Sequence, residues 1–293
     1  MIDRRQARKL AHHRSGQVCA WVDPERVRNS SAAVKSAPRK SNMNAPAAAS
    51  IRIQPLVALA AFRALLRDPD DTHQVFMIGE ALRGKSLART TARYRATPLG
   101  AKVLNGEYAL LPVLTNRVAL AALPAGSLGR AYLDFVVAEN LSAEGLVEAA
   151  RKRDAVSTAT PDEQALRRHI RDSHDLWHVL SGYGRDPLGE VCLLAFTHAQ
   201  TGFTGLGAVA LLGGLRIARQ LRGQPVRKAV LEGRRTGRAA QWLPAVDIAA
   251  LMPLELDTVR TRLDIAQPNT YRVIGRSLHP AGSTTSASQA VRT

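Results

Sequence analysis

The residues best suited to chemistry lie in one short stretch, His174-Asp175-Leu176-Trp177-His178, which is followed after eleven residues by Glu190. On a helix, positions i and i+4 share a face and positions i+1 and i+4 are neighbours, so His174, Asp175 and His178 would lie together. Imidazole and carboxylate groups in combination bind zinc, iron or manganese. The spacing therefore predicts a divalent metal site.

A second helix must bring Glu190 to the same point. The first helix is expected to break at Gly182-Tyr183-Gly184, and a new one to start at Asp186-Pro187, an N-cap residue followed by a proline at the first helical position. His178 precedes this turn by four residues and Glu190 follows the new N-cap by four, so an antiparallel helix pair brings them to about the same height. The predicted metal ligands are His174, Asp175, His178 and Glu190.

Simpler interpretations of these residues stay open. Two histidines four positions apart also occur in helices that bind no metal, and Asp186 can act only as a helix cap. In the His-Glu-x-x-His zinc proteases, the residue beside the first histidine is a glutamate that acts as general base. Here that residue is Asp175, and no other protease motif accompanies it. The glutamate at matching height favours a metal site, and a peptidase is disfavoured.

Two arginines precede the motif. Arg167 and Arg171 lie seven and three residues before His174, on the predicted metal-bearing face. A guanidinium beside a metal can bind a substrate carboxylate or phenolate through paired hydrogen bonds. It can equally form an ion pair that orients one of the carboxylate ligands. Both roles stay open for Arg171, the candidate substrate-binding residue.

Apolar residues recur at helical spacing along most of the chain. Aromatic residues make up only 4% of it, which suits closely packed helices better than a β-sandwich. The predicted fold class is all-α, a single-domain helical bundle with disordered N- and C-terminal tails. Helices are expected at 51–67, 71–83, 87–94, 128–139, 143–152, from 161 through the histidine pair, and on both sides of Gly202, the last at 203–220.

The predicted organisation places a helical metal- and lipid-binding domain at residues 51–266. Residues 1–50 form a basic tail, with ten Lys or Arg against three Asp or Glu before Met43, and are expected to be disordered, an extended start or a targeting segment. Residues 267–293 are predicted to be a polar tail. Cys19 and Cys192 are too isolated for a disulfide framework, so a reducing compartment is expected.

Residues 191–215 contain no Asp, Glu, Lys or Arg over 25 positions. That length could cross a bilayer, but Gly202 is expected to divide it into two helices, which are either buried in the core or form a lipid-pocket wall or membrane face.

Eight basic residues and one acid follow between Arg216 and Arg238, either as a solvated face or as a contact for anionic headgroups. The net charge of +17 also raises nucleic acid, but no nucleic-acid-binding fold or aromatic platform is evident, so no dedicated nucleic-acid partner is expected.

The complete motif, HDLWHVLSGYGRDPLGE, resembles that of the coenzyme Q (ubiquinone) biosynthesis proteins of the Coq-four type: His-Asp-x-x-His, eleven residues and Glu. Further similar segments are DTHQVFMIGEAL at 71–82, LPAGSLGRAYLDFV at 123–136, AQTG at 199–202 and the stretch 242–265. The resemblance covers roughly residues 50 to 266.

The resemblance implies a role in ubiquinone biosynthesis, acting on a polyprenylated benzenoid intermediate at a membrane surface. The implied activity is oxidative decarboxylation at ring carbon 1, in which a hydroxyl replaces a carboxyl group. The cofactor would be zinc, iron or manganese, of which zinc cannot carry out redox chemistry. Catalytic residues beyond the ligands are unknown.

Two other functions fit the same residues. One is a non-catalytic lipid-binding scaffold with a structural metal that organises other ubiquinone-biosynthesis enzymes. The other is a metal-dependent hydrolase that uses metal-activated water. We favour the enzyme. The expected location is peripheral to a membrane, at the cytoplasmic face in a bacterium or the matrix side of the inner membrane in a eukaryote, and a homodimer is possible.

Overall fold

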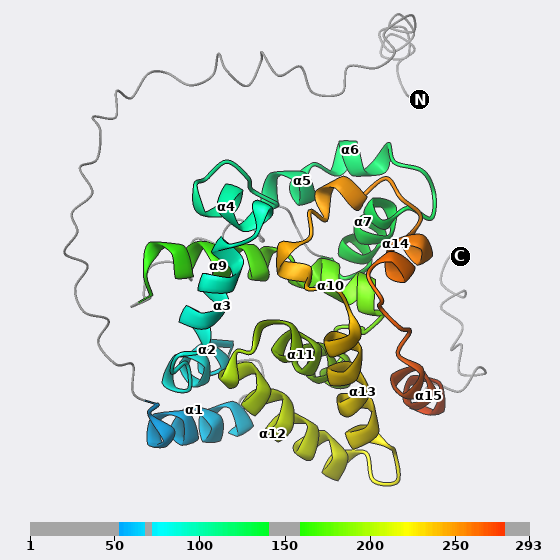
Figure 1. Cartoon of the computed structure of the whole chain (residues 1–293). Helices are drawn as coiled ribbons and strands as arrows, with labels where there is room; N and C mark the ends of the chain where they lie inside the picture. The colour runs from blue at the N-terminus through cyan, green and yellow to red at the C-terminus, as the bar shows by residue number, and fades with distance from the viewer. Residues whose placement is uncertain (1–52, 68–71, 141–158, 279–293) are drawn as a thin grey trace, which may run out of the picture. The chain divides into compact units, whose positions relative to one another are not determined.

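The computed structural model describes residues 53–67, 72–140 and 159–278. Within these ranges the chain is helical and no β-strand forms, which confirms the predicted all-α class (Figure 1). The predicted helix at 143–152 and the tail at 1–50 lie outside the described residues.

The helices are α1 (Pro55–Arg67), α2 (Thr72–Ala81), α3 (Ser86–Arg95), α4 (Pro98–Leu104), α5 (Leu111–Thr115), α6 (Arg117–Ala121), α7 (Leu128–Ala138), α9 (Pro161–Asp172), α10 (His174–Ser181), α11 (Pro187–Thr201), α12 (Thr204–Gln220), α13 (Val226–Ala239), α14 (Leu256–Arg262) and α15 (Asn269–Leu278), with short 3-10 turns at Leu243–Ala245 and Ala249–Leu251.

The turn between the two ligand-bearing helices forms as predicted. Gly182 ends α10 in the left-handed conformation, with φ of 75°. Asp186 then caps α11, its side-chain oxygen accepting hydrogen bonds from the backbone N–H groups of Leu188 and Gly189, and Pro187 occupies the first helical position. Gly202 ends α11 in the same left-handed way, so the apolar stretch is divided into α11 and α12. No described helix is both long enough and apolar enough to span a bilayer.

The helix predicted to run unbroken from residue 161 through the histidine pair is interrupted at Ser173. α9 ends at Asp172 and α10 begins at His174. The Ser173 hydroxyl donates a hydrogen bond to the carbonyl of His169, four residues earlier, at 2.7 Å. A serine that bonds back to this carbonyl competes with the backbone ladder and bends a helix. The prediction of a continuous helix was therefore wrong at this residue.

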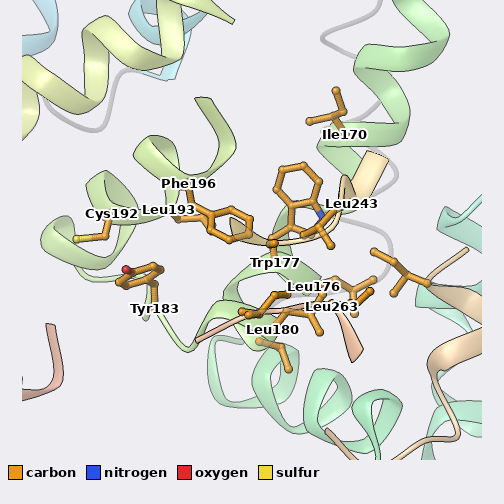
Figure 2. Packing of buried hydrophobic residues seen from close by; sticks show 14 of the residues in the cluster. Ile170, Leu176, Trp177, Leu180, Tyr183, Cys192, Leu193, Phe196, Leu243 and Leu263 are labelled. Atoms are coloured by element: carbon orange, nitrogen blue, oxygen red, sulfur yellow. The ribbon is translucent and has the colours of Figure 1, made fainter. Parts of the chain in front are cut away.

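The face of α10 away from its histidines is anchored in the hydrophobic core. Leu176, Trp177 and Leu180 are at most 1% exposed. Figure 2 shows Trp177 among side chains of α11 and the 3-10 turn at Leu243–Ala245, and its ring meets that of Phe196 edge-on at 6.0 Å. Because such interiors are close-packed, this anchoring fixes the rotation of α10 about its axis.

α11 and α13 pack backbone against backbone. A Cβ added to Gly233 or Gly237 of α13 would lie 2.5 Å from the carbonyl oxygen of Cys192 and 2.6 Å from that of Phe196, respectively. Only glycine allows so close an approach. Cys192 itself is buried, and burial raises the pKa of its thiol, as expected for a core residue.

The fold continues beyond the predicted domain end at residue 266. α15 occupies the first part of the segment interpreted as a polar tail, and it packs against α13 with Ile274 fully buried. Its apolar residues are few, and only part of them face the fold: Ile274 is buried whereas Val273 is 50% exposed, so overall composition concealed the helix. The remaining residues of the predicted tail, 279–293, lie outside the described residues.

Substituting Gly233→Ala should destabilise the protein by about 1–3 kcal/mol, because the new methyl group must push α13 away from α11. The matched control is Gly275→Ala in α15, where an added Cβ meets nothing within 4 Å. Alanine there should be neutral or stabilise by up to about 1 kcal/mol through helix propensity. Urea denaturation measures both, and equal midpoints for the two variants would contradict the close packing.

Candidate metal centre

α10 and α11 bring the four predicted ligand residues together. Ligand atoms of His174, Asp175 and His178 all lie within 4.8 Å of one another, and the two imidazole rings are in edge-to-face contact. Glu190, in the first turn of α11, approaches both rings: its Oε1 is 3.4 Å from Nε2 of His178 and its Oε2 is 3.7 Å from Nε2 of His174. The helix-pair geometry expected from the spacing is therefore present.

The His178 ring is completely buried and held in one tautomer. Its Nδ1 lies 3.0 Å from the carbonyl oxygen of Tyr183, in the turn between the helices. A carbonyl oxygen can only accept, so in the neutral imidazole Nδ1 carries the proton and Nε2 presents a lone pair. That buried Nε2 has no hydrogen-bond partner in the structure. A buried polar atom without a partner is costly, and a bound cation facing Glu190 would satisfy it.

His174 is oriented in a similar way by its neighbour. Its Nδ1 lies 3.3 Å from Oδ1 of Asp175, which leaves Nε2 directed toward Glu190. Burial alone would raise the pKa of Asp175, but the hydrogen bond with His174 and the electrostatic interactions with His174, His178 and Arg185 more than compensate and lower it. Asp175 therefore stays ionised, and it can either bind a cation itself or orient His174 as an outer partner.

Aromatic side chains of α7 close one side of the ligand group. Phe135 stacks on the His178 ring, with centroids 5.6 Å apart and planes inclined by 22°. Tyr132 is 1% exposed, and its hydroxyl pKa is raised by burial first and by the nearby Asp175 carboxylate second. An apolar wall of this kind lowers the local dielectric constant and strengthens electrostatic interactions with the ligands.

Arg185, which the sequence interpretation did not select, lies beside the candidate ligand group. Its Nε lies 3.9 Å from Oε1 of Glu190, and its Nη1 lies 4.0 Å from Oε2 of Glu139 at the end of α7. The sequence did offer one indication of this role, because Arg185 lies in the turn between the two helices predicted to carry the metal ligands. The contacts described for the two selected arginines are with other residues: Arg171 bonds Asp172 at 3.3 Å, and Arg167 pairs with Glu80 of α2.

Comparison with known proteins identifies the family. The model of the family described as "Coenzyme Q (ubiquinone) biosynthesis protein Coq4" matches residues 47–269, more than half of the chain. The chain belongs to this family. The four candidate ligand residues and the turn between their helices all fall within the match.

Curated relatives named as COQ4 homologues are similar to this chain over about three quarters of its length. The protein named "Ubiquinone biosynthesis protein COQ4 homolog, mitochondrial" from Danio rerio is 29% identical over 217 residues, 73% of this chain and 76% of the relative. Its Bos taurus counterpart is 26% identical over 73% of this chain and 78% of the relative. A crystal structure of a candidate ubiquinone biosynthesis protein from Nostoc punctiforme superposes with a TM-score of 0.55 at 22% identity, covering 74% of this chain and all of the other. This last likeness shows a shared fold.

In this Coq4-family chain, the turn that joins the ligand helices is braced by α15. The hydroxyl of Tyr271 accepts a hydrogen bond from the N–H of Gly184 at 3.0 Å and donates one to Asp186, the N-cap of α11. A Cβ at Gly182 would lie 3.2 Å from both Gln267 and Pro268, so the segment before α15 also packs on this turn. The brace holds both the Tyr183 carbonyl that orients His178 and the start of the helix that carries Glu190.

A second support comes from α14. The guanidinium of Arg260 donates to the carbonyls of Val179 and Leu180 at 2.8 and 2.9 Å, which satisfies backbone groups at the end of α10. Its Nη1 also pairs with Asp257 at 2.8 Å. Arg260 and Tyr271 lie roughly 80 and 90 residues from the turn they support, and no local pattern would have predicted them.

Tyr271→Phe should weaken binding of zinc, as a probe metal, by about tenfold, because it releases the turn that orients His178 and α11. It should also cost about 1 kcal/mol of stability. Tyr108→Phe is the control, since this hydroxyl also bonds a carboxylate, Asp247 at 2.9 Å, but makes no described contact with the ligand group. Calorimetric titration of both variants checks the difference, and an unchanged affinity in Tyr271→Phe would contradict a positioning role.

Proposed function

We propose that this Coq4-family protein carries out metal-dependent oxidative decarboxylation at carbon 1 of a polyprenylated benzenoid intermediate of ubiquinone biosynthesis. The ring carboxyl group would leave as carbon dioxide and a hydroxyl would take its place. The observation that carries the proposal is the unpartnered, buried Nε2 of His178 facing Glu190 beside His174 and Asp175. Membership of the family supplies the pathway.

The residues present fit a divalent cation held by His174, Asp175, His178 and Glu190. When bound, zinc, iron or manganese would supply a Lewis acid for the head group's carboxylate or phenolate, and iron or manganese would add redox capacity toward an oxidant such as dioxygen. Composition does not choose among the three metals.

The chain's own groups would orient and neutralise the substrate head group. Arg185 lies beside Glu190 and is partly exposed, so it can bind a substrate carboxylate through paired hydrogen bonds. Arg171 remains a further candidate for that contact. Phe135 and Tyr132 would exclude water from the side of the site next to His178.

We further propose that the protein works at a membrane surface together with other enzymes of the pathway. The chemistry supports this, because a polyprenyl tail keeps the intermediate in the bilayer. The curated relatives are named mitochondrial, which supports the matrix side of the inner membrane for a eukaryotic protein. In a bacterium the equivalent place is the cytoplasmic face.

The test is Glu190→Ala together with elemental analysis of the purified protein. The variant should keep its helical content by circular dichroism, lose bound metal, and lose quinone synthesis by at least about 100-fold, since even outer partners of a metal contribute 10- to 100-fold. His174→Ala should lose the metal as well. Normal quinone synthesis by folded Glu190→Ala would exclude the metal site.

The metal found also separates the alternatives. Stoichiometric iron or manganese supports oxidative chemistry on the ring. Zinc shifts support to a scaffold with a structural metal or to a hydrolase, because zinc has no redox chemistry. For a scaffold, Glu190→Ala should unfold the protein or release its partner enzymes, rather than leave it folded and inactive.

A further inference from the structure

A group of large apolar side chains is exposed on α1 and α12. Leu56 and Leu59 of α1 are 80% and 44% exposed, and Ile53 just before the helix is 56% exposed. Leu211 of α12 is 61% exposed. Single exposed apolar residues are common, but a group on neighbouring helices marks an interaction surface.

A cleft lies between the two helices and is lined by Phe62 of α1 and by several residues of α12. The cleft has a volume of about 350 Å³, and its apolar lining comes from Phe62 of α1 with Leu212 and Leu215 of α12. Leu59 lies three residues before Phe62, and Leu211 lies four before Leu215, so these two leucines are surface neighbours of the lining. Leu56 lies three residues before Leu59 and continues the exposed surface along α1. We call these exposed residues and the cleft the α1–α12 face.

Within α1 and α12 themselves, every charged side chain is basic. Neither helix contains an Asp or Glu. Arg216 and Arg219 line the cleft, and Arg63 and Arg67 are exposed on α1. The basic cluster predicted between residues 216 and 238 is thus divided, with its first two members at this cleft and its last five on α13.

We propose that the α1–α12 face docks on an anionic lipid bilayer, with its leucines entering the headgroup boundary and its arginines contacting lipid phosphates and carboxylates. Exposed apolar and basic side chains on two helices that carry no Asp or Glu are complementary to such a surface. The inference rests on the proposed membrane association and assigns it to particular residues.

The position of α12 connects this face to the candidate metal centre. On its other side, α12 packs against α11: a Cβ at Gly213 would lie 2.9 Å from Val191, the residue that follows Glu190. One helix, about 10 Å across, therefore separates the α1–α12 face from the start of the ligand helix. Docking through this face brings the ligand group close to the bilayer that holds a prenylated substrate.

Co-sedimentation of the full chain with lipid vesicles tests the proposal. The chain should bind vesicles of phosphatidylcholine with phosphatidylserine more tightly than phosphatidylcholine alone, and added salt should weaken binding through screening. Leu56→Ser combined with Leu211→Ser should lower the partition coefficient about tenfold or more. Arg216→Gln combined with Arg219→Gln should lower it about fivefold per charge.

Val118→Ser is the matched control for Leu56→Ser, because Val118 of α6 is 83% exposed, away from both helices. It should bind vesicles like the unmodified chain. Wild-type binding by the double leucine variant, or an equal loss in Val118→Ser, would overturn the proposal. So would a chain that ignores vesicles but forms a dimer dissociated by Leu56→Ser, since a second copy would then occupy the face.

The outcome is separable from that of the proposed function. The double leucine variant should retain its metal content and, in detergent, its turnover, whereas His174→Ala should lose metal and still bind vesicles. If the double leucine variant binds vesicles normally while metal and turnover are present, only the docking face is wrong. If turnover is absent in every preparation while the vesicle results hold, only the proposed chemistry is wrong.

Discussion

The candidate centre depends on the hydrogen bond from Nδ1 of His178 to the carbonyl oxygen of Tyr183. It fixes the tautomer, the ring orientation and the direction of the free lone pair in a side chain with no solvent exposure. The bond requires that the turn after α10 place one carbonyl accurately. The left-handed Gly182, the cap at Asp186 and the contacts from α14 and α15 all serve that requirement.

The remainder of the fold fixes the two ligand helices relative to each other. α10 is held through Trp177 and its leucine neighbours in the core, which leaves its opposite side for the histidines. α11 is held by the direct backbone contact with α13, which leaves little freedom to slide because no side chain separates the two helices at Gly233 and Gly237. Glu190 therefore approaches both imidazoles without a direct hydrogen bond of its own to position it.

The sequence alone predicted the features of the candidate site that depend on local backbone conformation and helix periodicity. The turn at Gly182, the cap at Asp186 and the meeting of His178 with Glu190 follow from backbone conformation and helix periodicity. The break at Ser173 was missed because periodicity takes no account of a serine that bonds back to the helix. Arg260 and Tyr271 were missed because their roles depend on contacts between distant parts of the chain, and a weak apolar pattern hid α15.

The bracing of the turn by α15 has a thermodynamic consequence. The family match ends at Asn269, where α15 begins, so Gln267 and Pro268 lie within the matched region and Tyr271 lies just beyond it. Helices with few buried side chains, such as α15, open locally more readily than the core, and opening of α15 would release Gly184 and Asp186. If docking of α15 on the turn strengthens the binding of a ligand at the candidate site, then binding of that ligand must stabilise docked α15. The two effects have the same coupling free energy. Occupancy of the site would then be measurable at a distance, as slower amide hydrogen exchange in the last described helix.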